Sequence, residues 1–278
     1  MRFSALKGLT AALLSLGLCA SAQAFYLNAN GAYNGKSDID GTGGAEVATS
    51  VYRLTLGNQY FTFGYKYTAY DFSGMDDPFD SLNYVFADGR YDGKISSDFG
   101  YFAGLTLGMG FEDDIHLSDN YAVSPRAGIS YKLTPGVDVF LGALAQFNEV
   151  DNQYLPIIGI KFGSESEMGW TGSIAYPATK VTYRPSPLYA FEGVFLTVRE
   201  FYQLADDSSL QQKGYIFEES YGASVGVIFT PLKMLELRAG VQSFFDREYT
   251  LYNSVGHELA SYDVDPSVGG YFNFNFKF

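Results

Sequence analysis

The chain ends in the segment Gly269–Phe278, which reads GGYFNFNFKF. In an extended conformation, side chains alternate between the two faces of a strand. One face of this segment therefore carries Phe272, Phe274, Phe276 and Phe278, and the other carries polar residues and one tyrosine. Four exposed phenylalanines on a terminal strand would promote aggregation of a soluble protein, whereas in a transmembrane barrel such a face contacts lipid. The segment predicts a membrane-spanning strand.

These ten residues resemble the last strand of bacterial outer-membrane β-barrel proteins. That strand typically ends in an aromatic residue, most often phenylalanine, which the assembly machinery reads as a signal. The resemblance implies an all-β fold, a transmembrane antiparallel up-and-down β-barrel in the bacterial outer membrane. It implies that Phe272, Phe274, Phe276 and Phe278 form the assembly signal. The partners expected are the barrel assembly machinery and the lipid and lipopolysaccharide of that membrane.

The first 24 residues have the features of a secretory signal peptide. Two basic residues precede the apolar run Leu9–Leu18, which is too short to cross a bilayer as a helix. Ala22-Gln23-Ala24 has the small-x-small pattern that a signal peptidase cleaves. We therefore expect cleavage after Ala24 and one barrel domain over residues 25–278. Cys19 is the only cysteine, so the mature chain would have no thiol for a disulfide, a metal site or a nucleophile.

Composition and charge support a barrel and argue against binding of nucleic acid. Apolar residues make up 47% of the chain, yet no stretch after residue 24 approaches the roughly 18 consecutive apolar residues of a transmembrane helix. The formal charge of the whole chain is −13, and removal of Arg2 and Lys7 lowers it by two, to −15. Nucleic acid is therefore not an expected partner, because binding its phosphates requires a basic face.

Two kinds of connection alternate between the predicted strands. The compact ones are rich in turn formers and lie at Gly57-Asn58, Leu133–Gly136, Arg184–Pro187 and Thr230–Lys233. The long ones are acidic or polar and comprise Gly35–Gly44, Ser73–Ser81, Glu112–Asp119, Asp206–Gly214 and Tyr252–Ser261. A barrel whose termini are periplasmic has short turns inside and longer loops outside. We therefore expect the acidic loops to face the cell exterior.

The alternating segments predict about 14 strands, an even number as in bacterial barrels. We expect these strands to start near Phe25, Ala45, Gln59, Leu82, Asp98, Asn120, Val137, Tyr154, Met168, Ala178, Leu188, Gly214, Lys233 and Asp265. Pro156, Pro177 and Pro185 interrupt the region Tyr154–Arg184, so two of its segments could belong to loops, and 12 strands is the alternative. A soluble β-sandwich would also alternate, but it rarely has small and polar residues on its core side opposite an aromatic face.

The polar face of the strands is predicted to line the barrel interior, where basic residues outnumber acidic ones. The candidate pore residues are Arg53, Lys66, Arg126, Lys132, Glu236 and Arg238, and Lys161, Lys180, Arg184, Lys277, Asp88, Arg90 and Glu192 share this face. Two interpretations stay open. Ion pairs such as Glu236 with Arg238 could fill a narrow barrel, or the bases could form a constriction that favours small anions.

Two histidines suggest an enzyme as an alternative. His116-Leu117-Ser118 with Asn120 resembles the His-x-Ser pair and nearby Asn of the outer-membrane phospholipase, and histidine is the natural base for a serine nucleophile. Leu117 and Asp119 replace the Gln and Gly of that family. His257-Glu258 with Asp263 suggests the Asp and His site of outer-membrane proteases, although a solvated loop accounts for these residues too.

Two acidic clusters, Glu112-Asp113-Asp114 and Asp76-Asp77 with Asp80, offer hard oxygen ligands for a divalent cation but lack the spacing of a calcium loop. We expect no cofactor, no bound metal and no enzymatic activity. The predicted function is a passive, porin-like pore biased toward small anions, or a structural role. The alternatives are a barrel hydrolase and a surface adhesin that acts through its acidic loops. The oligomeric state stays open.

Overall fold

The computed structural model describes residues 25–113, 115, 120–164 and 167–278. The predicted signal segment, residues 1–24, lies outside the described residues. Among the residues that are described, no helix is long and apolar enough to cross a membrane.

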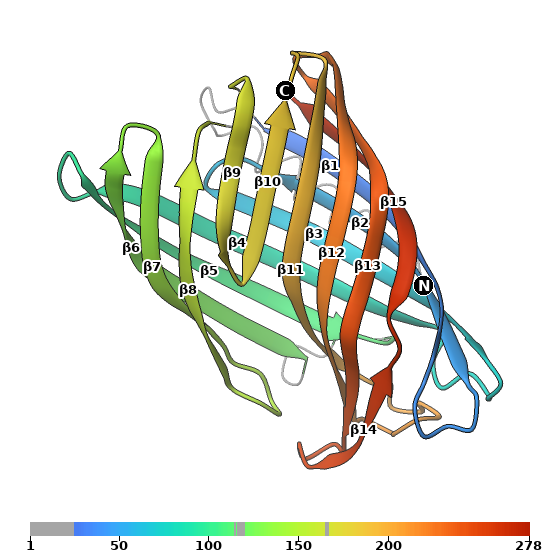
Figure 1. Cartoon of the computed structure of the whole chain (residues 1–278). Coiled ribbons are helices and arrows are strands. Elements are labelled where there is room, and N and C mark those ends of the chain that lie inside the picture. The colour runs from blue at the N-terminus through green and yellow to red at the C-terminus, as the bar shows by residue number, and fades with distance from the viewer. Residues whose placement is uncertain (1–24, 114, 116–119, 165–166) are drawn as a thin grey trace.

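The described chain folds into one closed antiparallel β-barrel (Figure 1). Its strands are β1 (Tyr26–Asp38), β2 (Glu46–Gly57), β3 (Phe61–Ser73), β4 (Ser81–Lys94), β5 (Phe99–Phe111), β6 (Tyr121–Thr134), β7 (Val137–Gln146), β8 (Gln153–Phe162), β9 (Gly169–Tyr176), β10 (Ala178–Arg184), β11 (Tyr189–Gln203), β12 (Tyr215–Leu232), β13 (Leu235–Tyr252), β14 (Glu258–Val264) and β15 (Ser267–Lys277). Each strand from β1 to β13 pairs with the next along the chain, and β15 pairs with β1 to close the barrel.

The last position in the barrel wall is shared by two strands. β14 pairs with Arg247–Tyr252 of β13, and β15 pairs with Leu235–Phe244 of the same strand. Pro266 separates β14 from β15, because proline lacks the N–H group that a continuous ladder needs. The described wall therefore has 14 strand positions, which confirms the predicted count. The predicted loop Tyr252–Ser261 is too long, since β14 already begins at Glu258.

The outer face of the barrel is apolar over its middle. Its exposed apolar side chains include Tyr52, Leu54, Leu105, Leu107, Ile129, Leu141, Ile158, Trp170, Phe191, Val225, Val241 and Phe272. These side chains would be costly in water, but lipid surrounds them in a membrane. Phe25 and Phe278 extend the pairing of β1 with β15, because Phe25 N donates to Phe278 O at 2.8 Å and Phe278 N donates to Phe25 O at 2.8 Å.

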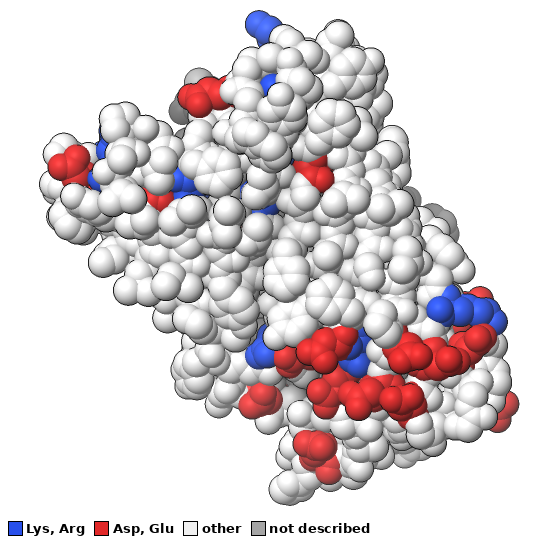
Figure 2. Space-filling view, in the orientation of Figure 1, with Lys and Arg blue, Asp and Glu red and all other residues white. Residues whose placement is uncertain are grey.

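The connections define two ends of the barrel. The turn end has Phe25, Phe278 and the connections 58–60, 95–98, 135–136, 163–168, 185–188 and 233–234, and the loop end has the connections 39–45, 74–80, 112–120, 147–152, 204–214 and 253–257. Acidic side chains gather at the loop end, at the bottom of the view, and few charges mark the middle of the visible face (Figure 2). Three of these acids, Glu219, Glu248 and Asp263, lie side by side on β12, β13 and β14.

The wall is not uniform in height. β9 and β10 are joined at the loop-end side by Pro177 alone, and β10 pairs with β11 only as far as Leu196. Beyond that point β11 turns away from its neighbour and reaches β5, where Gln203 pairs with Phe111. Figure 1 shows β9 and β10 ending at mid-height while β6, β7 and β8 spread away from β11.

A glycine permits this crossing of β11 to β5. A Cβ atom at Gly110 would lie 1.9 Å from the backbone oxygen of Phe201, so any other residue would force the two strands apart. As a result, β1–β5 and β11–β14 form a smaller ring at the loop end of the described structure, and β6–β10 lie outside it. The barrel is wide at the turn end and narrow at the loop end.

Candidate functional site

The interior of the barrel is the candidate site, and its loop end is filled by an apolar core. Buried side chains from the smaller ring meet there, namely Ile39, Val47, Tyr70, Phe79, Leu82, Tyr202, Leu204, Ile216, Tyr249, Leu251 and Val264. Tyr202 and Leu82 are 0% and 1% exposed. Protein interiors of this kind pack without water-sized channels. The straight route along the axis is therefore closed at the loop end.

Charged side chains lie directly on the turn-end side of this core. Lys66 of β3 forms an ion pair with Glu200 of β11, and the hydroxyl of Tyr202 donates to the same carboxylate at 2.5 Å. Glu218 of β12 accepts hydrogen bonds from the hydroxyls of Tyr70 at 3.5 Å and Tyr249 at 3.4 Å. These contacts join β3 to β11, β12 and β13 and stabilise the closed layer, because buried charges need partners.

A polar cavity of about 460 Å³ lies on the turn-end side of the charged layer, and its lining includes Asn28, Asn30, Arg53, Lys66 and Arg247. Asn28 and Asn273 exchange two side-chain amide hydrogen bonds here, at 3.0 and 2.8 Å. A second cavity of about 310 Å³ shares the Arg53 and Lys66 lining and extends to Asp88. The Arg53 guanidinium lies 4.8 Å from the ring centre of Phe86, which is a favourable cation–π contact.

Arg126 of β6 is held by Asp88 of β4 across the intervening strand. Two parallel hydrogen bonds of 2.8 and 2.9 Å join the guanidinium to the carboxylate, and Thr106 donates to Asp88 at 2.5 Å. A Cβ at Gly104 would lie 2.8 Å from the guanidinium, so the glycine leaves room for Arg126 to lie flat on the wall. This bidentate pair fixes the side chain and offsets its charge.

The turn end contains a larger and more basic cavity, of about 600 Å³. Among the described residues, the charged side chains that line it are Lys180, Arg184, Lys233, Glu236, Arg238 and Lys277. Five bases and one acid give this lining a net positive charge. Although the whole chain is acidic, basic residues predominate at this end of the interior.

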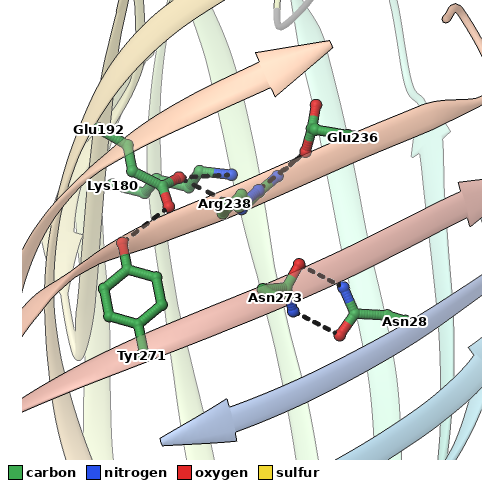
Figure 3. A network of polar contacts seen from close by, with 7 residues as sticks. All are labelled: Asn28, Lys180, Glu192, Glu236, Arg238, Tyr271 and Asn273. Atoms are coloured by element: carbon green, nitrogen blue, oxygen red, sulfur yellow. Dashed lines mark hydrogen bonds and ion pairs between the residues drawn. The ribbon is translucent and has the colours of Figure 1, made fainter. Parts of the chain in front are cut away.

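A network of polar contacts joins the turn-end cavity to the middle of the barrel (Figure 3). Arg238 contacts two carboxylates, Glu236 through its Nε at 2.8 Å and Glu192 through one terminal nitrogen at 3.2 Å. Lys180 lies 4.0 Å from Glu192, and the hydroxyl of Tyr271 donates to Glu192 at 3.3 Å. Glu192 is buried and thus has several donors around it, as a buried carboxylate requires.

The structure distributes the six candidate pore residues over different levels. Arg53 and Lys66 line the same cavities, and Glu236 contacts Arg238 in the turn-end cavity. Arg126 lies at the edge of the second cavity beside Asp88, and Lys132 pairs in register with Asp138 near the turn end, apart from the others. They do not form a single ring.

Sequence reasoning missed Glu200, Tyr202, Glu218 and Arg247, which form most of the charged layer. Alternation indicates on which face such residues lie, but not how far β11 leans into the barrel. Gly110 was the signal in the sequence for the approach of β11 to β5, but β5 contains several glycines and nothing in the sequence sets this one apart.

The candidate catalytic residues are only partly within the described structure. His116 and Ser118 lie outside the described residues, whereas Asn120 is fully buried and its backbone oxygen accepts from Gly110 at 3.2 Å. His257 is exposed in the loop 253–257, and Asp263 is exposed on β14. Within the described ranges, no group of three or more His, Cys, Asp or Glu side chains could hold a metal ion. Asp114, from one of the acidic clusters, is outside those ranges.

A closed antiparallel barrel with an apolar outer belt and a polar interior is the architecture of a bacterial outer-membrane β-barrel protein, and this chain is such a barrel in that membrane. No protein-family model and no curated protein matches it.

Among solved structures, the chain is similar to the NanC porin, with a TM-score of 0.42 and 8% identity over 91% of this chain and 100% of that one. It is also similar to the COG4313 outer membrane channel from Pseudomonas putida F1, with a TM-score of 0.47 and 10% identity over 94% of this chain and 97% of that one. A third similar structure is the KdgM porin in complex with disordered oligogalacturonate, with a TM-score of 0.37 and 9% identity over 90% of this chain and 99% of that one. At these identities the likeness concerns the barrel fold alone.

Proposed function

We propose that the barrel is a passive, porin-like channel that favours small anions. The observation that carries this proposal is the turn-end cavity of about 600 Å³, whose described lining has five bases against one acid. Charges of one sign on the low-dielectric walls of a confined space reinforce one another and raise the local concentration of the opposite ion. A small anion at this end of the interior would be attracted, and a cation would be repelled.

The ion pairs nearer the loop end do not contribute equally to such a preference. Arg126 and Lys66 each have a carboxylate partner within the interior, so their charges are largely offset. Arg184, Lys233 and Lys277 extend the basic lining toward the turn-end mouth, beyond the carboxylates of Glu192 and Glu236. Selectivity is therefore expected to arise at the turn end and not at Arg126.

The reversal potential of the purified full-length protein in a planar bilayer under a salt gradient tests this proposal. The wild type should conduct and should prefer chloride over potassium. Arg184→Gln together with Lys277→Gln should shift the reversal potential toward the cation, because these side chains supply part of the positive lining. Lys36→Gln is the matched control, since Lys36 is at the loop end, paired with Glu46 and half exposed. A barrel that does not conduct, or one that prefers potassium over chloride, would contradict the proposal.

A further inference from the structure

The barrel wall has a break in its hydrogen bonding between β8 and β11. β8 pairs with β9 only through Ile158–Phe162, so Gln153–Ile157 have no strand partner on that side among the described residues. On the facing edge, β10 covers β11 only as far as Leu196. The short β9–β10 hairpin therefore leaves a window in the wall, which we call the lateral window.

The two edges of the lateral window would be unfavourable in plain lipid. An unpaired strand edge exposes N–H and C=O groups, and at membrane depth such groups are tolerated only where protein covers them or where they line a watery cavity. The side chains flanking the window on the outer face are apolar and exposed, with Tyr154 at 71%, Ile158 at 56% and Phe195 at 37%. The window thus opens at the loop-end margin of the apolar belt, where Arg199 pairs with Glu219. Pro156 lies on the β8 edge, where its missing N–H leaves one fewer donor unpaired.

Two contacts bound the lateral window. Toward the turn end, the backbone N–H of Thr197 donates to the oxygen of Pro177 at 3.1 Å. Toward the loop end, the Arg199 guanidinium donates to the side-chain oxygen of Gln153 at 2.7 Å, and the same guanidinium pairs with Glu219. One residue, Val198, separates Thr197 from Arg199, so the two limits are about 7 Å apart at the rise of a strand. The Arg199 side chain therefore forms the loop-end edge of a narrow window.

Polar atoms at the lateral window are left without partners. The hydroxyl of Thr197 and the Nε of Arg199 are buried, and neither has a hydrogen-bond partner in the described structure. Buried polar groups are normally satisfied by protein, water or ligand.

The chemistry changes along the path from the window inward. Leu155 and Ile157 of β8 alternate with the exposed residues of that strand, so they point to the interior and present an apolar surface. Lys180 lies two residues beyond Ala178, the first residue of β10 at the hairpin tip, and it lines the basic turn-end cavity. A solute that enters here would meet an apolar surface first and positive charge next.

We propose that the lateral window is the route by which solutes pass between the outer surface of the barrel and its interior, and that it suits small amphipathic anions with one apolar ring. This inference rests on the proposed anion channel. Its basis is that the axial route is filled by the loop-end core, while the wall is interrupted at the window. The apolar part of such a solute matches the window edges, and its anionic group matches Lys180 and the cavity beyond.

Two sulfonates of equal charge test the route and the solute class, because neither becomes neutral and leaks through lipid at neutral pH. Toluenesulfonate has an apolar ring and methanesulfonate has none. Both sulfonates should carry current through the full-length protein in a planar bilayer, and the toluenesulfonate current should be the larger. Arg199→Ala should raise the toluenesulfonate current, because it removes the contact with Gln153 that limits the window and so widens it.

A reversible closure of the window makes the test specific. Gln153→Cys with Arg199→Cys, in a chain with Cys19→Ser, can be bridged by a short bifunctional thiol reagent that a reductant removes. Bridging should lower both sulfonate currents at least fivefold, and reduction should restore them. Ala127→Cys with Ala143→Cys is the matched control, since these exposed residues already face each other on paired strands. Heat-modifiable gel migration confirms that each variant is folded.

The possible failures are distinguishable. No anion current in the wild type would refute the proposed channel itself. A current that is unchanged by bridging the window would leave the channel in place and overturn the lateral route. A methanesulfonate current that falls on bridging, with no toluenesulfonate current in any variant, would overturn the solute class.

Discussion

Glu200 and Glu218 face each other directly across β11 and β12, with both carboxylates inside the barrel. Like charges in this position repel each other and destabilise a sheet. The ion pair from Lys66 to Glu200 and the tyrosine hydroxyls on Glu218 offset this repulsion. The charged layer under the loop-end core is therefore held together by contacts among β3, β11, β12 and β13.

The ion pair of Lys66 should be essential to the stability of the closed layer. Its side chain is 13% exposed and that of Glu200 is 20% exposed, so Lys66→Met leaves a nearly buried carboxylate without its partner. Loss of one partner of such a pair costs about 3–5 kcal/mol. Urea unfolding in detergent should show this loss. The double variant Lys66→Met with Glu200→Gln should recover most of the stability, and a double variant as unstable as the sum of both single variants would contradict the assignment.

The crossing of β11 to β5 should depend on Gly110. A Cβ atom at this position would lie 1.9 Å from a backbone oxygen of β11, which cannot move without moving the strand. Overpacking of this kind costs about 1–3 kcal/mol, so Gly110→Ala should lower the urea midpoint. Gly193→Ala is the control on β11 itself, because a Cβ there meets no atom within 4 Å. Equal midpoints for the two variants would show that the close approach does not matter.

Phe278 should be needed for assembly in cells. Its backbone exchanges two hydrogen bonds with Phe25, and its ring stacks on Phe25 and Phe276 with centroid distances of 6.2 and 6.0 Å. Deletion of Phe278 leaves the closing edge of the barrel unpaired, which is costly in lipid. The heat-modifiable folded band from cell membranes should decrease strongly, and Phe278→Tyr should restore it. Normal folding and yield of the deletion variant would refute the assembly signal.

The acidic loop end should face the cell exterior. Lys213 is in the loop 204–214 with a side chain that is 60% exposed, and Lys233 is exposed in the opposite turn. Trypsin added to intact cells should cleave after Lys213, and Lys213→Gln should abolish that cleavage. Cleavage after Lys233 should require spheroplasts. The reverse pattern would invert the orientation of the barrel.

Much of the wall was predictable from local alternation. The expected starts at Phe25, Ala45 and Val137 lie within one residue of the observed strands β1, β2 and β7. The strands near Pro156 and Pro177 also form, because each proline lies at a strand edge or at a hairpin tip, where no ladder hydrogen bond is lost. Period-two patterns report the face of a strand, which is why they predicted Arg53 and Lys66 for the barrel interior.

Long-range contacts were not predictable in this way. Lys66 and Glu200 are 134 positions apart, and alternation gives no information on which interior residues meet across the barrel. The inward turn of β11 depends on the close approach at Gly110, and a glycine in an alternating run does not differ from its neighbours in the sequence. Pro156, Pro177 and Pro185 predicted an irregular region, but they did not predict a break in strand pairing that is limited by the contact of Arg199 with Gln153.

The unequal ends of the barrel make it a funnel. Barrel diameter grows roughly in proportion to strand number, so a loop end built from β1–β5 and β11–β14 is about two-thirds as wide as the 14-position turn end. A bulky molecule can fill the turn-end mouth although it cannot fit the opposite end. Such a molecule would block the barrel from one side of a membrane only, and the current would rectify in its presence.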